Sequence, residues 1–167
     1  MSLEALKDRL PDYAKDQFAN LGQIAGSTAL TPAQAWTVAI AAAASTKNKL
    51  VLEHLIEEAK LEPAAVTAAK GAATVMAMTN VYYRSMHFLG GDYEKLPARL
   101  RMQIIAKPGI AHLDFELACL AASAIEGCER CVVSHERSAR EKGATVEAIQ
   151  DAIRIAAIVN ATAAALT

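Results

Sequence analysis

The 167-residue sequence has few of the features that mark β-sheets, membrane spans or nucleic-acid-binding proteins. It contains no Asn-Gly or Asp-Gly turn and no sustained alternation of polar and apolar residues, so hairpins and half-buried strands are not expected. The formal charge is −1 with both signs interspersed, which excludes the basic stripe that nucleic acids require. The longest apolar run, residues 35–44, is about half a membrane span. We therefore expect a protein that binds neither nucleic acid nor membrane.

Residues 1–16 lack the uninterrupted apolar segment of a secretory signal, because charges are spread through them. The chain has only three cysteines, too few for a disulfide framework. We therefore expect a cytoplasmic protein. Cytosolic thiols are kept reduced, so a close cysteine pair in such a chain is more often catalytic or metal-binding than a structural disulfide. The third cysteine, Cys119, lies in an apolar segment and is expected to be a small buried hydrophobic residue.

What the chain has instead is alanine, together with signals that begin and end helices. The stretch Thr31–Gln34 has the spacing of a capping box with proline at the first helical position, and Pro63 can begin another helix. Gly143 and Thr145 are placed to end one helix and to begin the last. Helices lined by alanine can approach one another closely. We predict an all-α fold, a compact bundle of seven or eight helices.

The two halves of the chain are faintly alike. Residues 36–45 resemble residues 115–124, and each stretch is followed by a polar break and then by a helix that contains a histidine. An alanine-rich helix closes each half. We predict a single domain, residues 1–167, with a weak internal repeat over 31–89 and 110–166. Only the second copy of this repeat holds cysteines.

The segment EGCERCVVSHE contains two cysteines and a histidine at helical spacing. Cys128 and Cys131 are three residues apart and His135 follows four residues later, so a helix beginning near Cys128 places all three on one face. The unpaired N–H groups and positive dipole end at a helix start favour a thiolate, and a nearby imidazole can take the proton. Arg130 adds positive charge, whereas two neighbouring glutamates oppose it. The pattern predicts a redox-active cysteine pair at the start of a helix.

Glu116 is the only charged residue in the run 115–125. An ionised carboxylate on a helix that is otherwise apolar is expensive to bury without a partner. This helix leads directly into Cys128, so we expect it to pack against the cysteine helix, where His135 can be the partner. A chain of glutamate, histidine and thiol can move a proton to and from a sulfur. The alternative is that Glu116 reaches solvent at a groove or a subunit boundary.

Other kinds of site could use the same residues. A c-type haem needs a histidine directly after the second cysteine, where Val132 stands, and an iron–sulfur cluster usually takes four cysteines. Nothing indicates the βαβ pattern of a thioredoxin-like fold. Zinc stays open, because enough ligand-type side chains are present. They are Cys128, Cys131 and His135, with Glu116 or His112 as the fourth ligand.

The pattern of these residues resembles the alkyl hydroperoxidase D (AhpD) family of the carboxymuconolactone decarboxylase-like superfamily. The motif that carries the resemblance consists of Glu116, Cys128, Cys131 and His135 at their spacing in this chain. Three further segments resemble the family, namely LPDYAKD near the start, NVYYR in the middle and LRMQIIAKPGI before the motif. The resemblance covers essentially the whole chain. It implies an AhpD-like all-α fold and an antioxidant peroxidase with a CxxC redox centre.

The resemblance also implies a role for each residue of the motif. Cys131 would be the peroxidatic thiolate that passes through a sulfenic acid, and Cys128 the proton donor that then closes a disulfide with it. His135 and Glu116 would form the proton relay. Members of the family carry a histidine between the cysteines, where this chain has Arg130. Arginine cannot shuttle protons at neutral pH, but it could stabilise the thiolate electrostatically.

The source of electrons follows from the same resemblance. Hydroperoxide would be reduced to alcohol and water, or electrons would pass to a partner peroxiredoxin (AhpC). The disulfide would be re-reduced by dihydrolipoamide carried on a lipoylated acyltransferase subunit of a 2-oxoacid dehydrogenase complex. No metal, haem or flavin would be bound, and the subunits would form a homotrimer. Two other functions stay open: a zinc-stapled helical module without catalysis, and a carboxymuconolactone decarboxylase-like enzyme whose cysteines are idle.

Overall fold

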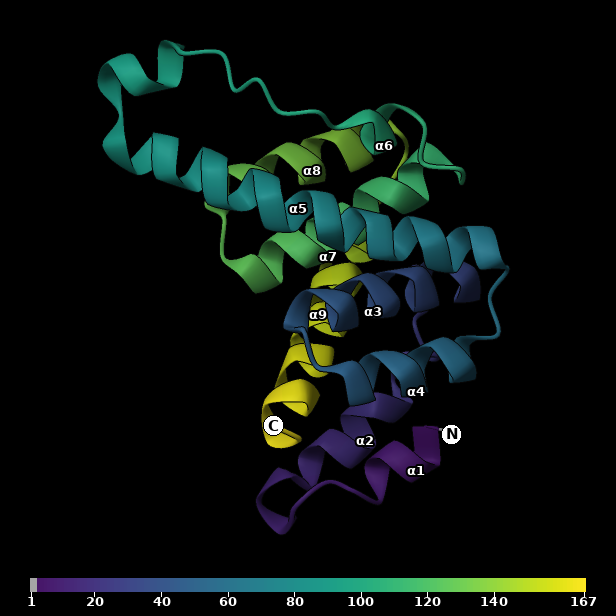
Figure 1. Cartoon of the computed structure of the whole chain (residues 1–167). Coiled ribbons are helices and arrows are strands. Elements are labelled where there is room, and N and C mark those ends of the chain that lie inside the picture. The colour runs from purple at the N-terminus through teal and green to yellow at the C-terminus, as the bar shows by residue number, and fades with distance from the viewer. Residues whose placement is uncertain (1–2) are drawn as a thin grey trace.

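A computed structural model describes residues 3–167, and all regular structure within this range is helical (Figure 1). In chain order the helices are α1 (Leu3–Lys7), η1 (Asp12–Ala14), α2 (Asp16–Gly22), α3 (Pro32–Thr46), α4 (Lys49–Ala59), α5 (Pro63–Leu89), η2 (Gly91–Lys95), α6 (Gln103–Ala106), α7 (His112–Glu126), α8 (Glu129–Glu141) and α9 (Val146–Ala165), where η marks a short 3-10 helix. The all-α prediction is confirmed. The described residues form nine α-helices rather than seven or eight. A helix as short as α6 has no capping side chain, so the sequence contains no signal that predicts it.

The main helices begin where the sequence signals place them. The hydroxyl of Thr31 accepts a hydrogen bond from the backbone N–H of Gln34 at 3.2 Å, and the Gln34 amide oxygen accepts from the Thr31 N–H at 3.0 Å. This is the predicted capping box, and it begins α3. Thr145 caps α9 in a similar way by accepting from the N–H of Ala148 at 3.1 Å. Pro63 is the first residue of α5, as predicted.

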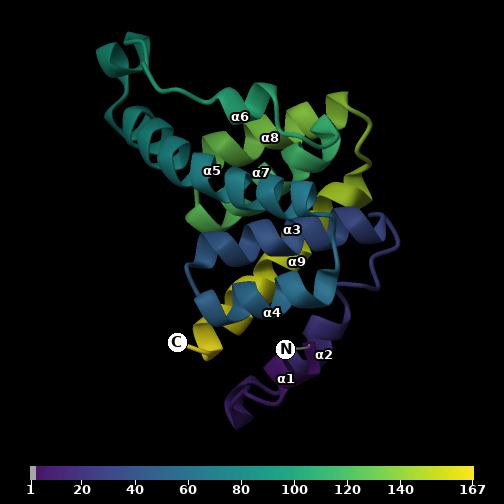
Figure 2. The ribbon, with the colours of Figure 1, turned by 45° about the vertical axis from the view of Figure 1, so that its right-hand side comes forward.

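Helices α3 and α7 form the centre of the fold. α3 packs against α4, α5, α7 and α9, and α7 packs against α3, α5, α8 and α9. Figures 1 and 2 show α5, α6 and α8 at one end of the molecule and α1, α2 and α4 at the other, with α3 between them. Both central helices carry fully buried alanines, among them Ala39, Ala42 and Ala121. Their small side chains let the helices approach closely, and this fixes the position of α8 through α7.

The long connection between α5 and α7 packs against the body through α6 and the residue before it. Ile104 of α6 lies directly over Gly71 of α5, where an added Cβ would be only 2.1 Å from the Ile104 Cδ1 atom. The missing side chain at Gly71 therefore makes room for the contact. Met102 and Ile105, on either side of Ile104, are packed against the core. The contact fixes the segment that forms one wall of the cavity described below.

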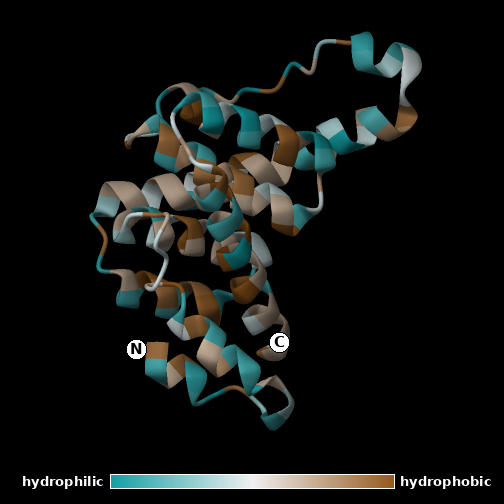
Figure 3. Cartoon of the chain, turned by 180° about the vertical axis from the view of Figure 1, so that it is seen from behind, coloured by the Kyte–Doolittle hydropathy of each residue, from teal (hydrophilic) through white to brown (hydrophobic). Residues whose placement is uncertain are grey.

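The C-terminal end of α5 and η2 form an arm, residues 86–96, that extends away from the helical body (Figures 1 and 2). Phe88, Leu89, Tyr93 and Leu96 are all more than half exposed on this arm. Figure 3 shows that η2 itself is largely hydrophilic, with hydrophobic residues where it joins α5 and the following loop. Although α5 has 27 residues, neither it nor any other helix within residues 3–167 is long and apolar enough to cross a membrane.

The two halves of the chain contain helices in the same order of lengths. α3 and α7 each have 15 residues, and each is followed by a shorter helix and then by a longer one. This order suits the expected internal repeat over residues 31–89 and 110–166, which stays a prediction. The single domain over residues 1–167 also stays a prediction, and its first two residues lie outside the described part of the chain.

Candidate active site

The cysteine motif lies at the junction of α7 and α8. Gly127 ends α7 with a φ of +68°, a left-handed conformation that glycine adopts without strain. Cys128 is the N-cap residue of α8, in an extended conformation, and its N–H donates to the carbonyl of Ser123 at 3.3 Å. Cys131 follows within the first turn of α8, and His135 lies about one turn further on. The helix therefore begins where the sequence predicted, with the three side chains on one face.

The two cysteines of the motif differ in their access to solvent. Cys128 is completely buried, whereas Cys131 is 5% exposed and lines a cavity of about 430 Å³. Both are free thiols, and so is Cys119, which is buried in the core as expected. Cys131 therefore carries the sulfur that a molecule in the cavity can reach, and Cys128 lies behind it.

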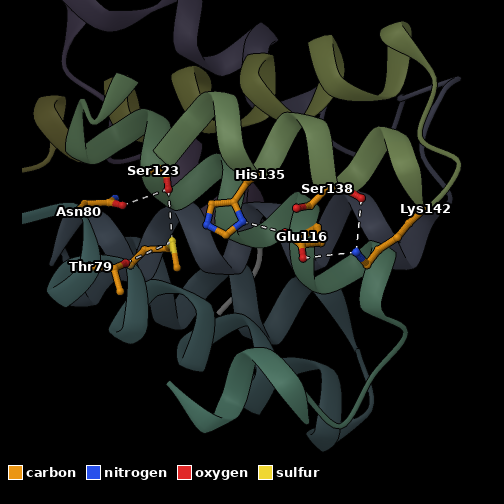
Figure 4. Close-up of polar contacts among 8 residues, drawn as sticks. Thr79, Asn80, Glu116, Ser123, His135, Ser138 and Lys142 are labelled. Carbon is orange, nitrogen blue, oxygen red and sulfur yellow. Dashed lines mark hydrogen bonds and ion pairs between the residues drawn. The ribbon is translucent and has the colours of Figure 1, made fainter. Parts of the chain in front are cut away.

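Glu116 lies in the wall of the same cavity and has two partners. Its Oε2 atom accepts a hydrogen bond from Nδ1 of His135 at 2.7 Å, and its Oε1 atom lies 3.7 Å from Nζ of Lys142 (Figure 4). Glu116 is 8% exposed, so it is paired with His135 rather than turned to solvent. Because the carboxylate holds the Nδ1 proton, the Nε2 atom of His135 is left as the proton acceptor. Cys131, His135 and Glu116 all line one cavity.

The thiol of Cys131 is not acidified in this arrangement. Burial and, after it, hydrogen bonding with the Cys128 thiol raise the pKa of Cys131 to about 12, while Arg130 and Arg84 act in the opposite direction. The thiolate that the family resemblance implies for Cys131 is therefore not favoured in the reduced site, and easy loss of its proton stays a prediction. Desolvation of the buried sulfur outweighs the two guanidinium groups. A thiolate here requires a base that takes the proton when a substrate arrives, and His135 is placed in the same cavity.

Arg84 is a site residue that belongs to the segment NVYYR, which resembles the family, but nothing in the sequence assigns it a role at the thiol. It lies on α5, and its guanidinium donates a hydrogen bond to the carbonyl of Glu126 at the end of α7. Its charge lowers the pKa of Cys131. The signal that could have found Arg84 is its spacing of four residues from Asn80, a completely buried polar residue on the same helix. That spacing places both on the face of α5 that packs against α7.

The remaining cavity walls come from parts of the chain far from the cysteines. The residues that complete the lining are Met76, Thr79 and Tyr83 of α5, Met102 and Ile105 before α7, and Arg130, Ser134 and Ser138 of α8. Most of the side chains from α5 and from the segment before α7 are apolar. These side chains are not reactive, so the sequence does not mark them as site residues. Only the packing of α5 on α8 and of α6 on α5 shows that they face the cavity of Cys131. The cavity therefore combines an apolar wall with a polar, sulfur-containing one.

A second polar group joins α5 to α7 beside this cavity. The Ser123 hydroxyl lies 3.3 Å from the Asn80 Oδ1 atom and 3.3 Å from the Met76 sulfur, and the Thr79 hydroxyl lies 3.8 Å from the same sulfur (Figure 4). Ser123 is also the residue whose carbonyl accepts from the N–H of Cys128. These contacts hold the cysteine turn at a fixed position against α5.

The side chains named as possible zinc ligands are not grouped as a metal site in the described residues. Within residues 3–167, no group of three or more His, Cys, Asp or Glu side chains is placed so that it could hold a metal ion. The His135 Nδ1 atom is occupied by Glu116. His112, the other candidate fourth ligand, is an exposed residue at the start of α7. The geometry therefore favours proton transfer over metal binding at these residues.

Comparison with known proteins gives full-length matches. A sequence model of the Carboxymuconolactone decarboxylase family matches residues 91–167, which include the whole cysteine motif. The alkyl hydroperoxide reductase AhpD of Rhodospirillum centenum is 51% identical over 169 aligned positions, covering 99% of this chain and 91% of the relative. The proteins of the same name from Gluconacetobacter diazotrophicus and Streptomyces coelicolor are 49% and 48% identical, covering 99% and 96% of this chain and 93% and 92% of theirs.

Proposed function

We propose, from the premise that this chain belongs to the alkyl hydroperoxide reductase AhpD family of the carboxymuconolactone decarboxylase superfamily, that it reduces organic hydroperoxides with a CxxC dithiol. The observation that carries the proposal is the common cavity of Cys131 and the His135–Glu116 pair, with Cys128 buried behind it. These groups supply a nucleophile, a base with its orienting carboxylate, and a second thiol. The apolar wall of the cavity suits the organic part of a hydroperoxide.

In the first half of the proposed cycle, His135 takes the proton of Cys131 through its Nε2 atom, directly or through one water molecule. Glu116 stabilises the imidazolium that forms, since it already accepts the Nδ1 proton at 2.7 Å. The thiolate attacks the terminal oxygen of the hydroperoxide and the O–O bond breaks. The alkoxide takes a proton and leaves as alcohol, and Cys131 is oxidised to a sulfenic acid. The base explains how a thiol of raised pKa can react at neutral pH.

In the second half, the thiol of Cys128 attacks the sulfenic sulfur of Cys131. Water leaves, and a disulfide joins the two residues. The sum is one hydroperoxide and two thiols converted to alcohol, water and one disulfide. Cys128 and Cys131 lie at the N-cap and in the first turn of the same helix, and Cys128 is near enough to raise the pKa of Cys131, so little movement is needed to form this bond.

The cycle closes by thiol–disulfide exchange with an external dithiol. We propose dihydrolipoamide on a lipoylated acyltransferase subunit of a 2-oxoacid dehydrogenase complex, with no metal, haem or flavin taking part. The reduced pair Cys128 and Cys131 can instead reduce the disulfide of a partner peroxiredoxin (AhpC), because Cys131 can attack a disulfide as well as a peroxide. We also propose that the subunits form a homotrimer, because the exposed apolar side chains of the arm offer surface for a subunit contact. Sedimentation equilibrium measures whether it forms.

The electron donor is tested by a peroxide-reduction assay with three reductants. We expect turnover with dihydrolipoamide and at least about tenfold less with thioredoxin or glutathione, because a small dithiol can enter the cavity and close its own ring after exchange. The measurement is hydroperoxide consumed per enzyme at equal reducing equivalents. Equal rates with all three donors would contradict the proposed specificity, and no turnover with any of them would contradict the peroxidase itself.

Glu116→Gln is expected to lower the rate of hydroperoxide reduction about ten- to a hundredfold while the fold is kept, because a neutral amide cannot stabilise the protonated ring of His135. The measurement is kcat with dihydrolipoamide, with circular dichroism to check folding. Glu136→Gln is the matched control, since Glu136 neighbours His135 in the chain but lies 3.9 Å from Arg140 on the helix surface. Full activity of Glu116→Gln would refute the relay.

The two alternative functions have their own tests. A zinc-stapled module would contain stoichiometric zinc when purified without chelator, which metal analysis measures. A carboxymuconolactone decarboxylase-like enzyme would turn over its true substrate without using its thiols. Unaltered turnover of such a substrate by Cys131→Ser would count against any thiol mechanism.

A further inference from the structure

Arg130 lies between two cavities of the surface. It lines the inner cavity that holds Cys131 and also an outer groove of about 600 Å³. Its guanidinium carbon lies 5.8 Å from the centre of the Tyr83 ring, within the range of a cation–π contact. Half of its side chain is exposed. Arg130 therefore faces the cavity of Cys131 on one side, where its charge can stabilise the thiolate, and the outer groove on the other.

Glu94 approaches Arg130 from the outer groove. It belongs to η2, the segment on the arm, and its Oε1 atom accepts from an Nη atom of Arg130 at 2.9 Å. The same Oε1 atom lies 3.6 Å from Nδ1 of His87 on α5. The other charged groups of the groove are Glu129 and Arg137, both on α8 with Arg130. The only carboxylate that another element brings to this groove is that of Glu94.

We propose that Glu94 is a positioning residue that binds the guanidinium of Arg130 and thereby weakens the support of this cation for the thiolate of Cys131. The inference rests on the proposed role of Cys131 as the reactive thiol. It adds a residue outside the motif, on a segment that extends away from the helical body, to the control of that thiol.

The electrostatics give the direction of the effect. Arg130 and Arg84 are the two cations that act on Cys131, whereas Glu94 is not among the groups that act on the thiol directly. Arg84 is held by the carbonyl of Glu126, a neutral group, so its charge stays uncompensated by that contact. Arg130 is held by a full negative charge. Removing that charge leaves more of the field of Arg130 acting on the sulfur, so the thiolate becomes easier to form.

The position of Glu94 on the arm has a consequence for regulation. A second copy of the chain that binds residues 91–95 and draws Glu94 away from Arg130 would raise the reactivity of Cys131. The ion pair is partly exposed, with Glu94 at 38%, so it is weak enough to be broken by such a contact. The apolar side chains that flank η2 give that second copy a surface to bind.

The test is the rate at which iodoacetamide alkylates Cys131 at about pH 8, where histidine rings are mostly uncharged. This reagent is neutral, so a change in local charge alters the rate through the thiolate fraction. We expect Glu94→Gln to speed alkylation about two- to fivefold, the range that a pair of partly exposed charges allows. Arg130→Gln is expected to slow it. Mass spectrometry of the peptide with Cys131 gives the rate for this sulfur alone.

Two comparisons make the test specific. Asp92→Asn removes the same charge from the same segment, but Asp92 pairs with Lys95 at 2.7 Å, so its alkylation rate should equal that of the unaltered chain. In an Arg130→Gln background, Glu94→Gln should have no further effect. The inference is overturned if Glu94→Gln alone leaves the rate unchanged or slows it, or if its acceleration persists without Arg130. Arg130→Met serves the same purpose if the glutamine variant does not fold.

Alkylation uses neither hydroperoxide nor an electron donor, so this experiment is independent of the proposed peroxidase activity. A chain that shows the Glu94 effect but reduces no hydroperoxide keeps the inference about the thiol and loses the proposed function. A chain that reduces hydroperoxide but shows no Glu94 effect keeps the function and loses the inference.

Discussion

Cys131→Ser is expected to abolish the consumption of hydroperoxide with dihydrolipoamide as donor. A serine hydroxyl is far less acidic than a thiol, and its oxygen can form neither a sulfenic acid nor a disulfide. Cys131 is the only cysteine that lines the cavity, because Cys128 and Cys119 are both completely buried. No other sulfur of the cysteines can therefore replace it. The measurement is the rate of peroxide loss above the rate without enzyme.

Cys119→Ala is the matched control for this loss. Cys119 lies in the core between α3, α5 and α7, and burial raises the pKa of its thiol well above the ordinary value. A variant without it should keep most of its activity, since the thiol has no access to substrate. If Cys131→Ser still reduces hydroperoxide at a rate like that of the unaltered chain, the thiol mechanism is excluded whatever the control shows.

The helix starts that the sequence predicted depend on contacts within a few residues. The capping box of Thr31, the proline at the start of α5 and the cap at Thr145 are each determined by groups one turn apart. The Glu116–His135 contact joins two neighbouring helices and was predicted from the cost of burying a lone carboxylate. Such features follow from short-range chemistry, so one sequence is enough to find them.

The acidity of Cys131 depends on burial, which the local pattern does not contain. Arg130 was visible in the sequence, and its charge lowers the pKa of Cys131 as expected. The larger influence is desolvation by α5 and by the segment before α7, together with the thiol of Cys128. The same long-range packing brings Arg84 and Glu94 to the site. Spacing from the buried Asn80 places Arg84 on the inner face of α5 but does not show that it reaches the cysteines, and no spacing indicates Glu94, since α5 and η2 approach α8 only in the folded chain.

Cys128→Ser is expected to stop catalytic turnover while leaving the first chemical step intact. Cys131 can still be oxidised to a sulfenic acid, but no thiol remains at position 128 to displace water from it. Each chain should therefore reduce about one equivalent of hydroperoxide and then stop, unless an external thiol slowly takes over. Single-turnover stoichiometry and trapping of the sulfenic acid by dimedone measure this.

The substitution at Cys128 suits the structure, so the loss can be assigned to chemistry. Cys128 is the N-cap residue of α8 and has no side-chain capping bond, whereas serine is among the preferred N-cap residues. Serine is also close to cysteine in size, so the buried site is filled and α8 is expected to keep its position. Unchanged thermal unfolding together with a single burst of peroxide reduction is the expected result. Continued turnover at the normal rate would show that Cys128 does not resolve the oxidised sulfur.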